Sequence, residues 1–139
     1  MISTRGRYAI RFMLDLAENS NGRSVPLKEI AERQAISKKY LEIIARDLVA
    51  GNLITGSSGK GGGYMLCRKP EEYPLDEILE LTEGTLSPVA CLNAEENTCP
   101  RKEICRTLPL WTDFYHLVQD FFHSRTLYDL ISPDTLPGL

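Results

Sequence analysis

Residues 26–51, P-L-K-E-I-A-E-R-Q-A-I-S-K-K-Y-L-E-I-I-A-R-D-L-V-A-G, contain two helical segments joined by a tight break. Pro26 suits the first turn of the first segment, because an N–H at that position has no partner inside the helix. The break falls at residues 35–36, and Ser37 is a good N-cap for the segment that follows. We expect this second helix to end in a left-handed cap at Gly51 and to bury four apolar side chains: Leu41, Ile43, Ile44 and Leu48.

A helix before this stretch and a hairpin after it complete the unit. Residues 8–17 carry apolar side chains at helical spacing, and the loop-forming sequence N-S-N-G follows at 19–22. Two short β-runs, residues 53–55 and 64–67, flank a glycine-rich tip at 56–63. Three helices with a tight turn between the last two, followed by a hairpin, predict a winged helix-turn-helix.

The rest of the chain is expected to be helical around one irregular loop. Residues 75–84 predict a short amphipathic helix ended by a glycine. Residues 85–106 combine prolines, polar residues and three cysteines, which is typical of a loop. A long helix over 109–125 and a short last helix are expected to precede a tail at 132–139.

The expected fold class is mainly α (α+β), in three parts. A winged helix-turn-helix DNA-binding domain covers residues 1–69, a connector helix and cysteine-bearing sensor loop cover 70–106, and a dimerisation helix with a C-terminal tail covers 107–139. A chain of 139 residues excludes a large multidomain enzyme. No phosphate-binding loop or nucleophile-elbow motif is present, which argues against an enzyme.

The sequence also bears on localisation and on charge. No apolar run approaches the roughly 20 residues that span a bilayer, and the first residues lack the apolar region of an export signal, so we expect a cytoplasmic protein without membrane association.

Residues 1–69 carry 12 lysines and arginines against 6 acidic residues, whereas residues 70–139 carry 4 against 13. This asymmetry indicates that the first half meets a polyanion.

The second helix of a helix-turn-helix enters the major groove of DNA with its first residues against base edges. The candidates for DNA contact at that helix start are Ser37, Lys38, Lys39, Tyr40 and Glu42. Lysines suit phosphates, whereas Glu42 could accept a hydrogen bond from a cytosine amino group. The glycine-rich tip with Lys60 suits the minor groove, and Arg5 and Arg7 near the start of the first helix can hold phosphates. A capped surface helix and a plain hairpin loop would explain each feature singly, but their combination favours DNA binding.

Three of the four cysteines, Cys91, Cys99 and Cys105, lie in the loop with seven and five residues between them. Cytosolic thiols stay reduced, and three thiols on one segment could converge on a soft metal. Their spacing leaves zinc and an iron–sulfur cluster open. The fourth ligand also stays open among solvent, another subunit and these side chains: Glu95, Glu96, Glu103, His116 and His123. Cys67, in the second β-run, is expected to be a small buried hydrophobe.

The long helix carries an apolar stripe wider and more aromatic than a small domain needs for its own core. The stripe consists of Leu110, Trp111, Phe114, Leu117, Val118, Phe121 and Phe122. Two copies of such a helix could cross in a symmetric dimer, and the alternative is packing against the winged domain. A monomer would recognise too few bases, which favours a homodimer on a palindromic operator.

Several motifs resemble one known family. They are R-G-R-Y-A-x-x-x-M-L-D-L-A (5–17), I-A-E-R-Q-x-I-S-x-x-Y-L-E (30–42) and G-x-G-G-G-Y-x-L (59–66). These motifs resemble the Rrf-type family of bacterial winged helix-turn-helix transcriptional regulators, and within it the IscR-like iron–sulfur cluster regulators. L-W (110–111) and T-L-x-D-L (126–130) extend the resemblance to nearly the whole chain.

The resemblance implies a homodimer held by the long C-terminal helix, a palindromic operator on double-stranded DNA, and a 4Fe–4S or 2Fe–2S cluster that modulates DNA affinity. It places the cluster on Cys91, Cys99 and Cys105, and DNA reading on Ser37, Tyr40 and Glu42. The chain also departs from the family's pattern. Leu108 stands where IscR-like members have a histidine, Tyr8 where nitric oxide sensors have an aspartate, and Ser58 where the wing has an arginine, with Lys60 close by.

The leading hypothesis from the sequence is a dimeric repressor whose loop cysteines hold an iron–sulfur cluster that senses iron, redox or nitrosative state. The alternative is a cluster-free regulator of the same fold, controlled by a partner protein or by zinc or thiol chemistry.

Overall fold

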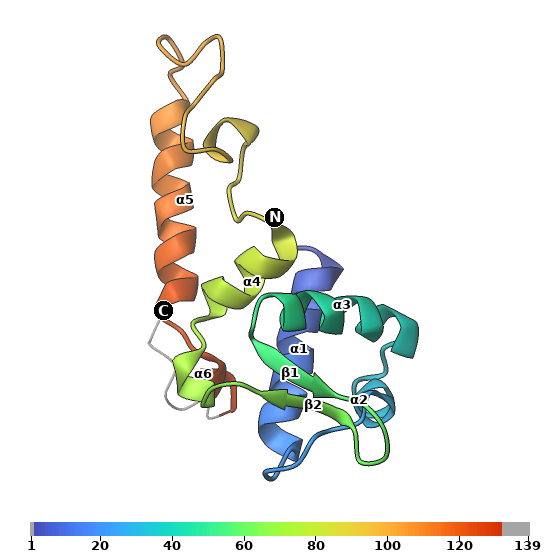
Figure 1. Ribbon diagram of the computed structural model, residues 1–139. Coiled ribbons are helices and arrows are strands. Elements are labelled where there is room, and N and C mark those ends of the chain that lie inside the picture. Colours follow the sequence, from blue (N-terminus) through green and yellow to red (C-terminus); the bar gives the residue numbers. More distant parts are fainter. Residues whose placement is uncertain (1, 132–139) are drawn as a thin grey trace.

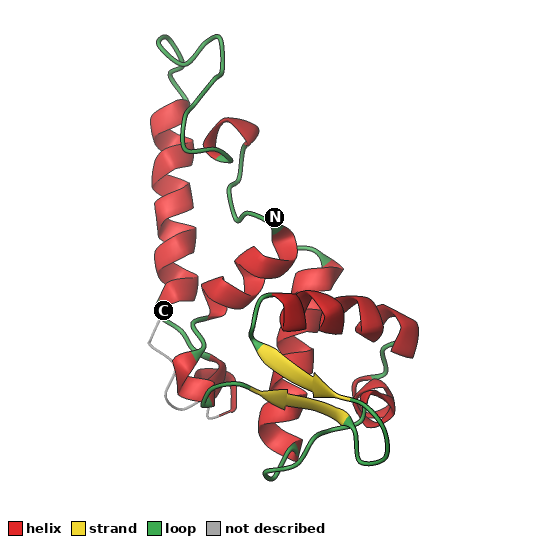
Figure 2. Ribbon diagram, in the orientation of Figure 1, coloured by secondary structure: helices red, strands yellow, loops and turns green. Residues whose placement is uncertain are grey.

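The computed structural model describes residues 2–131 and is mostly helical, with one two-stranded antiparallel sheet (Figures 1 and 2). The first half contains α1 (Thr4–Asn19), α2 (Leu27–Gln34), α3 (Lys38–Ala50), β1 (Ile54–Ser57) and β2 (Gly63–Leu66). The second half contains the 3-10 turn η1 (Pro70–Glu72), α4 (Leu75–Glu83), the 3-10 turn η2 (Ala90–Leu92), α5 (Leu108–His123) and α6 (Leu127–Ile131). This order confirms the winged helix-turn-helix and the helical second half. The tail expected at 132–139 lies outside the described residues.

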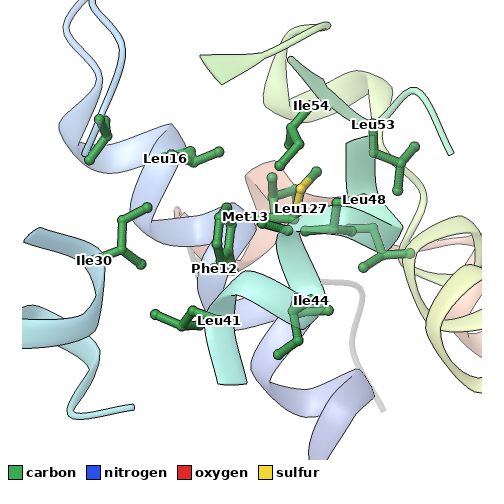
Figure 3. Packing of buried hydrophobic residues seen from close by; sticks show 14 of the residues in the cluster. Phe12, Met13, Leu16, Ile30, Leu41, Ile44, Leu48, Leu53, Ile54 and Leu127 are labelled. Carbon is green, nitrogen blue, oxygen red and sulfur yellow. The ribbon is translucent and has the colours of Figure 1, made fainter. Parts of the chain in front are cut away.

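One apolar core joins the helices of the first half to the base of the wing. Figure 3 labels ten of its fully buried side chains: Phe12, Met13, Leu16, Ile30, Leu41, Ile44, Leu48, Leu53, Ile54 and Leu127. Burying one such side chain stabilises the fold by about 1.5–3 kcal/mol. Leu127 belongs to α6, so the chain returns to the winged domain after α5.

The start of α3 is as expected, whereas the position of its left-handed cap and one of its faces are not. The hydroxyl of Ser37 accepts a hydrogen bond from the amide of Tyr40 at 3.1 Å, which confirms the N-cap. The left-handed residue after the helix is Asn52, with φ +60°, and not Gly51, with φ −85°. Asparagine visits this region because its short polar side chain can hydrogen-bond locally. The expected burial of Ile43 is also wrong, because it lies on the outward face of α3 and is 41% exposed.

The wing is anchored on the segment before α2. β1 and β2 pair from Ile54↔Leu66 to Ser57↔Gly63, so both strands are shifted from the expected runs. Val25 and Tyr64 exchange both backbone hydrogen bonds at 2.9 Å, which adds a bridge outside the hairpin. A Cβ at Gly63, whose φ is +155°, would overlap the backbone of Val25. Only glycine therefore lets the wing approach this closely.

The strand pairing stops before Cys67. The amides of Cys67 and Arg68 donate to the hydroxyl of Tyr73 at 2.9 and 3.0 Å, so they leave the β-ladder. The side chain of Cys67 is exposed, and the expectation that it is a buried hydrophobe is therefore wrong.

α4 packs across the start of α1, and α5 extends away from the core (Figure 1). The carboxylate of Glu83 at the end of α4 accepts from the amide and hydroxyl of Ser3, both at 2.8 Å. Gly6 permits this approach, because a Cβ there would overlap the Glu83 side chain. The cysteine loop, residues 85–106, lies at the far end of α5 from the wing (Figure 1). Among the described residues no helix is long and apolar enough to cross a bilayer.

Candidate nucleic-acid interface

A groove of about 790 Å³ lies between α3, the start of α2 and the wing. Its polar lining comes from all three elements: Lys28, Lys38, Glu42, Arg46, Ser57 and Ser58. Several wing positions along the groove are glycines, including Gly62 and Gly63, which leave the wall without bulky side chains. We call this surface the α3–wing groove. Its walls are the recognition helix and the wing of the expected DNA-reading unit.

The α3–wing groove carries an excess of unpaired positive charge. Lys28, Lys38 and Arg46 stand against one carboxylate, that of Glu42. In the described chain none of these four side chains makes a hydrogen bond or an ion pair. Cations on a concave surface without internal partners can bind an anionic ligand without first breaking an ion pair. The groove therefore suits a strand of phosphates.

Two of these cations, Lys28 and Arg46, were not among the residues that the sequence singled out. Lys38, Glu42 and Arg46 follow one another at four-residue spacing, so a helical projection of α3 would have placed Arg46 beside the predicted residues. Lys28 lies on α2, and its place in the groove depends on how α2 packs against α3.

The predicted residues at the start of α3 lie in different settings. Lys39 is exposed, whereas the hydroxyl of Ser37 is already used as a helix cap. The ring of Tyr40 is half-buried and meets that of Tyr8 edge to face, with 5.6 Å between ring centroids. The guanidinium of Arg11 lies over the other ring, 5.2 Å from the centroid of Tyr8. Tyr40 is therefore held by α1 with a fixed ring direction.

The tip of the wing is shaped by its glycines. Gly59 and Gly61 have φ of +87° and +80°, a region that favours glycine. Ser58, just before Gly59, and Lys60, between the two glycines, are exposed. Ser58 lines the α3–wing groove, whereas Lys60 lies beyond its lining residues. The tip thus places one hydroxyl and one ammonium group at its surface.

Arg5 and Arg7, both expected to hold phosphates, are not equivalent. Arg5 forms an ion pair with Asp47 in the last turn of α3. Arg7 is exposed, and its guanidinium donates to the hydroxyl of Thr4 at 3.2 Å. Arg5 therefore joins α1 to α3, whereas only Arg7 faces solvent fully.

The three loop cysteines are free thiols of intermediate exposure. Within residues 2–131 no group of three or more His, Cys, Asp and Glu side chains is arranged to hold a metal ion. The convergence expected for Cys91, Cys99 and Cys105 is therefore not seen in this structure. His123, a candidate fourth ligand, contacts Asp76 at 2.9 Å at the end of α5 away from the loop.

One of the three thiols is distinguished by its surroundings. The hydroxyl of Thr107 lies 3.4 Å from Sγ of Cys105, just before the start of α5. Hydrogen bonding from Thr107 lowers the pKa of the Cys105 thiol below its ordinary value of 9.0. A lower pKa increases the fraction of thiolate, which is the nucleophile and the metal ligand.

The family model for Rrf2, described as an iron-dependent transcriptional regulator, matches residues 2–133. The chain belongs to the Rrf2 family. This Rrf2-family chain is 36% identical over 135 residues to the protein rrf2 of Nitratidesulfovibrio vulgaris, covering 97% of this chain and 89% of that protein. The resemblance seen in the sequence motifs is thereby confirmed.

Two solved structures resemble the Rrf2-family chain over nearly its whole length. CymR, the global cysteine regulator of B. subtilis, superposes with a TM-score of 0.75 and 32% identity, covering 95% of this chain and 96% of that chain. IscR of T. potens superposes with a TM-score of 0.76 and 27% identity, covering 100% and 93%. The chain is therefore a transcriptional regulator of the IscR and CymR type and not an enzyme.

The Rrf2-family chain presents an apolar stripe on α5. Leu110, Phe114, Leu117 and Phe121 lie on one side of the helix and are between 38% and 68% exposed. Val118 on another side is the buried residue of the helix. A small apolar groove of about 240 Å³ adjoins the stripe and is lined by Ile2, Leu117, Val118, Phe121 and Phe122. Among residues 2–131 the core of the single chain therefore does not cover this stripe.

Proposed function

We propose that this protein is a homodimeric DNA-binding repressor that recognises a palindromic operator with α3 and the wing. The α3–wing groove carries this proposal, because within residues 2–131 its cations have no ion-pair partner and lie on the concave side of a helix-turn-helix. Phosphate contacts supply most of the affinity of such proteins, and contacts to base edges supply the sequence preference.

In the proposed complex, α3 enters the major groove and the wing follows the minor groove. Lys38 and Lys39 hold phosphates, Glu42 reads a base edge, and Ser37 and Tyr40 contact either. At the wing, Ser58 and Lys60 contact the sugar-phosphate backbone and the minor groove. Arg7 extends the phosphate contacts along the start of α1. Arg5 contributes mainly by holding α1 against α3 through Asp47.

The exposed stripe of α5 supports the dimer. In a two-fold dimer the stripe of each copy would pack against the stripe of the other, so both sets of four apolar side chains would be removed from water. The resulting pair would present two recognition helices to two half-sites. Occupation of an operator that overlaps a promoter would exclude RNA polymerase, which is the basis for proposing repression.

The cysteine loop is the proposed sensor, and its donor chemistry fits an iron–sulfur cluster. Three thiols on one segment match the thiolate ligands that such clusters use. A bound cluster would supply a centre that changes with iron and redox state. The loop must close to bring Cys91, Cys99 and Cys105 together, because they do not form a ligand group in the structure. Since the loop runs directly into α5, closure would bear on the dimer helix.

The second candidate function is direct thiol sensing without a cluster. The separate thiols and the lowered pKa of Cys105 favour it. The structural likeness to CymR, a cysteine regulator, adds support. In this alternative, modification of a loop thiol changes the start of α5, and no metal is needed.

Operator selection from random duplex DNA with anaerobically purified protein tests the DNA-binding part of the proposal. A single palindromic sequence should emerge and bind one dimer, and absence of any preferred sequence would contradict the proposal. Iron and sulfide are then quantified in the wild type, in the C91S/C99S/C105S variant and in the C67S control. Cluster binding predicts iron and sulfide in the wild type and the control only. Thiol sensing predicts no iron, with operator affinity that still changes on oxidation.

A further inference from the structure

Tyr73 lies outside the proposed DNA interface, yet its hydroxyl holds both ends of the wing. The side chain is fully buried beside the base of the hairpin. Its hydroxyl donates to the carbonyl of Leu53, just before β1, at 2.7 Å. The same oxygen accepts from the amides of Cys67 and Arg68, just after β2, at 2.9 and 3.0 Å. One donor and two acceptor positions are all that a phenol offers, so every one of them is used on the wing.

The backbone of the same residue belongs to the other half of the molecule. The carbonyl of Tyr73 accepts a hydrogen bond from the amide of Leu127 at 3.0 Å. The amide of Leu75 donates to the backbone carbonyl of Arg125 at 2.9 Å. Pro74 and Thr126 form a bridge between these two bonds. The segment around Tyr73 is therefore paired with the corner between α5 and α6.

Arg68 links the segment after the wing to α4. Its guanidinium makes two hydrogen bonds to the carboxylate of Glu77 on α4, at 2.9 and 2.6 Å. It also lies 4.7 Å from the ring centroid of Tyr73. The residue that follows the wing is thus fixed to α4 by its side chain and to Tyr73 by its amide.

A role in filling the core does not account for the hydroxyl. A phenylalanine would fill the same volume, but it would leave the carbonyl of Leu53 and two amides without their partner. Burial also raises the pKa of Tyr73, so the hydroxyl stays protonated and able to donate to Leu53 at physiological pH. The side chain is therefore suited to a permanent connection and not to titration.

We propose that Tyr73 is a positioning residue that fixes the wing to the α5–α6 corner, so that the wing follows any displacement of that corner. The connection itself is independent of the proposed function, and only its effect on operator affinity rests on that function. Because α5 starts at the cysteine loop and ends at this corner, the connection offers a physical route from the loop to the wing.

The test compares full-length wild-type protein with Tyr73→Phe and with the control Tyr128→Phe. Tyr128 lies on α6 and is 39% exposed, and its hydroxyl has no hydrogen-bond partner among residues 2–131. Amide hydrogen exchange is measured first, on DNA-free protein. In Tyr73→Phe the amides of Cys67 and Arg68 and those of the β1–β2 ladder should exchange at least about tenfold faster, because local opening becomes easier. Core amides of α1 and α3 should exchange as in the wild type, which also shows that the variant is folded.

Operator affinity of the same proteins is measured second. Tyr73→Phe should bind the operator about tenfold more weakly, because a more mobile wing loses phosphate contacts. Its affinity should also depend less steeply on salt concentration. The Tyr128→Phe control should bind as the wild type does. If Tyr73→Phe does not fold, Arg68→Gln replaces it: this variant frees the residue after the wing from α4, so the amides of Cys67 and Arg68 should exchange faster than in the wild type, and unchanged exchange at both amides would overturn the connection.

The outcomes separate this inference from the proposed function. Unchanged wing exchange in Tyr73→Phe would overturn the connection, whatever the DNA result. Faster wing exchange with unchanged operator affinity would overturn its role in DNA binding. A wild type that binds no duplex would overturn the proposed function, while the exchange data would still decide whether Tyr73 holds the wing.

Discussion

Replacing Lys28 and Arg46 by alanine tests whether the α3–wing groove holds a DNA strand. Both side chains line the groove and lack partners in the described part of the chain, so their removal breaks no hydrogen bond or ion pair of the fold. Lys28 is on the exposed side of α2 and Arg46 on that of α3. Alanine also favours helix in both positions. The double variant should therefore keep its stability, and any loss of affinity reports on the interface.

The expected loss follows from the number of cations removed. One phosphate contact contributes a slope of about 0.9 in log affinity against log salt. At 0.15 M salt this amounts to about 0.7 log units, or roughly fivefold and about 1 kcal/mol for each cation. The double variant should then bind its operator about 30-fold more weakly, and the slope should fall by about 1.8.

The assay is fluorescence anisotropy with a labelled operator duplex at several salt concentrations between 50 and 200 mM, on metal-free reduced protein. Lys102→Ala/Arg106→Ala serves as the matched control, because both side chains are exposed on the cysteine loop at the opposite end of the molecule (Figure 1). That control changes the net charge equally but should leave the slope unchanged. A Lys28→Ala/Arg46→Ala protein with the slope of the wild type would refute the assignment of the groove to DNA. A slope that falls equally in the Lys102→Ala/Arg106→Ala control would show that the two cations act through the general field of the protein and not through phosphate contacts.

Three further predictions concern the wing, the cysteine loop and the connector. Gly63→Ala should destabilise the protein by about 2 kcal/mol or more in urea unfolding, because the left-handed backbone and the close approach to the loop before α2 both exclude a Cβ; a wild-type midpoint would show that the wing is not docked there. Thr107→Val should slow alkylation of Cys105 at pH 8, since loss of the hydrogen bond returns the pKa of the thiol toward 9.0; equal rates would contradict the assigned cause. The hydrogen bond from Arg68 lowers the pKa of Glu77 below its ordinary 4.5, so this group stabilises the fold above pH 4.5 and loses that effect as the pH falls through the lowered pKa. Glu77→Gln should therefore be less stable than wild type at pH 7, with a gap that narrows as the pH is lowered from 4.5 through the acid range, and a constant gap would count against the ion pair.

Local signals in the sequence predicted the helices well because their determinants are local. Ser37 caps α3 through the amide three residues later, which is an interaction that the sequence order alone dictates. The left-handed residue after α3 is Asn52, one position beyond the expected Gly51, since glycine and asparagine stand side by side at 51–52 and both tolerate a left-handed backbone. Ile43 has the composition of a core residue, and only the packing of α3 shows that its side is the outward one.

The features that the sequence did not reveal depend on contacts between distant residues. Cys67 leaves the strand because its amide finds the hydroxyl of Tyr73, and no periodic pattern records that hydrogen bond. Lys28 and Arg46 meet across one groove only because α2 packs against α3. The motif I-A-E-R-Q-x-I-S-x-x-Y-L-E (30–42) ends before Arg46 and begins after Lys28, so neither cation could be taken from it.

On the proposed function, the opposite charges of the two halves of the chain would also orient the protein on DNA. The first half carries the excess of lysine and arginine and includes the α3–wing groove, whereas the second half carries the excess of aspartate and glutamate. A polyanion attracts the first and repels the second, so approach is biased toward the groove before any base is read. The repelled half includes α5, so in the proposed dimer its apolar stripe would stay available to the second copy while the groove is occupied. Since Tyr73 joins these halves through its hydroxyl and its carbonyl, a change at α5 has a short covalent and hydrogen-bonded route to the wing. On the proposed function, a displacement of the α5–α6 corner would move the wing through Tyr73, so regulation by the cysteine loop would need no large rearrangement of the core.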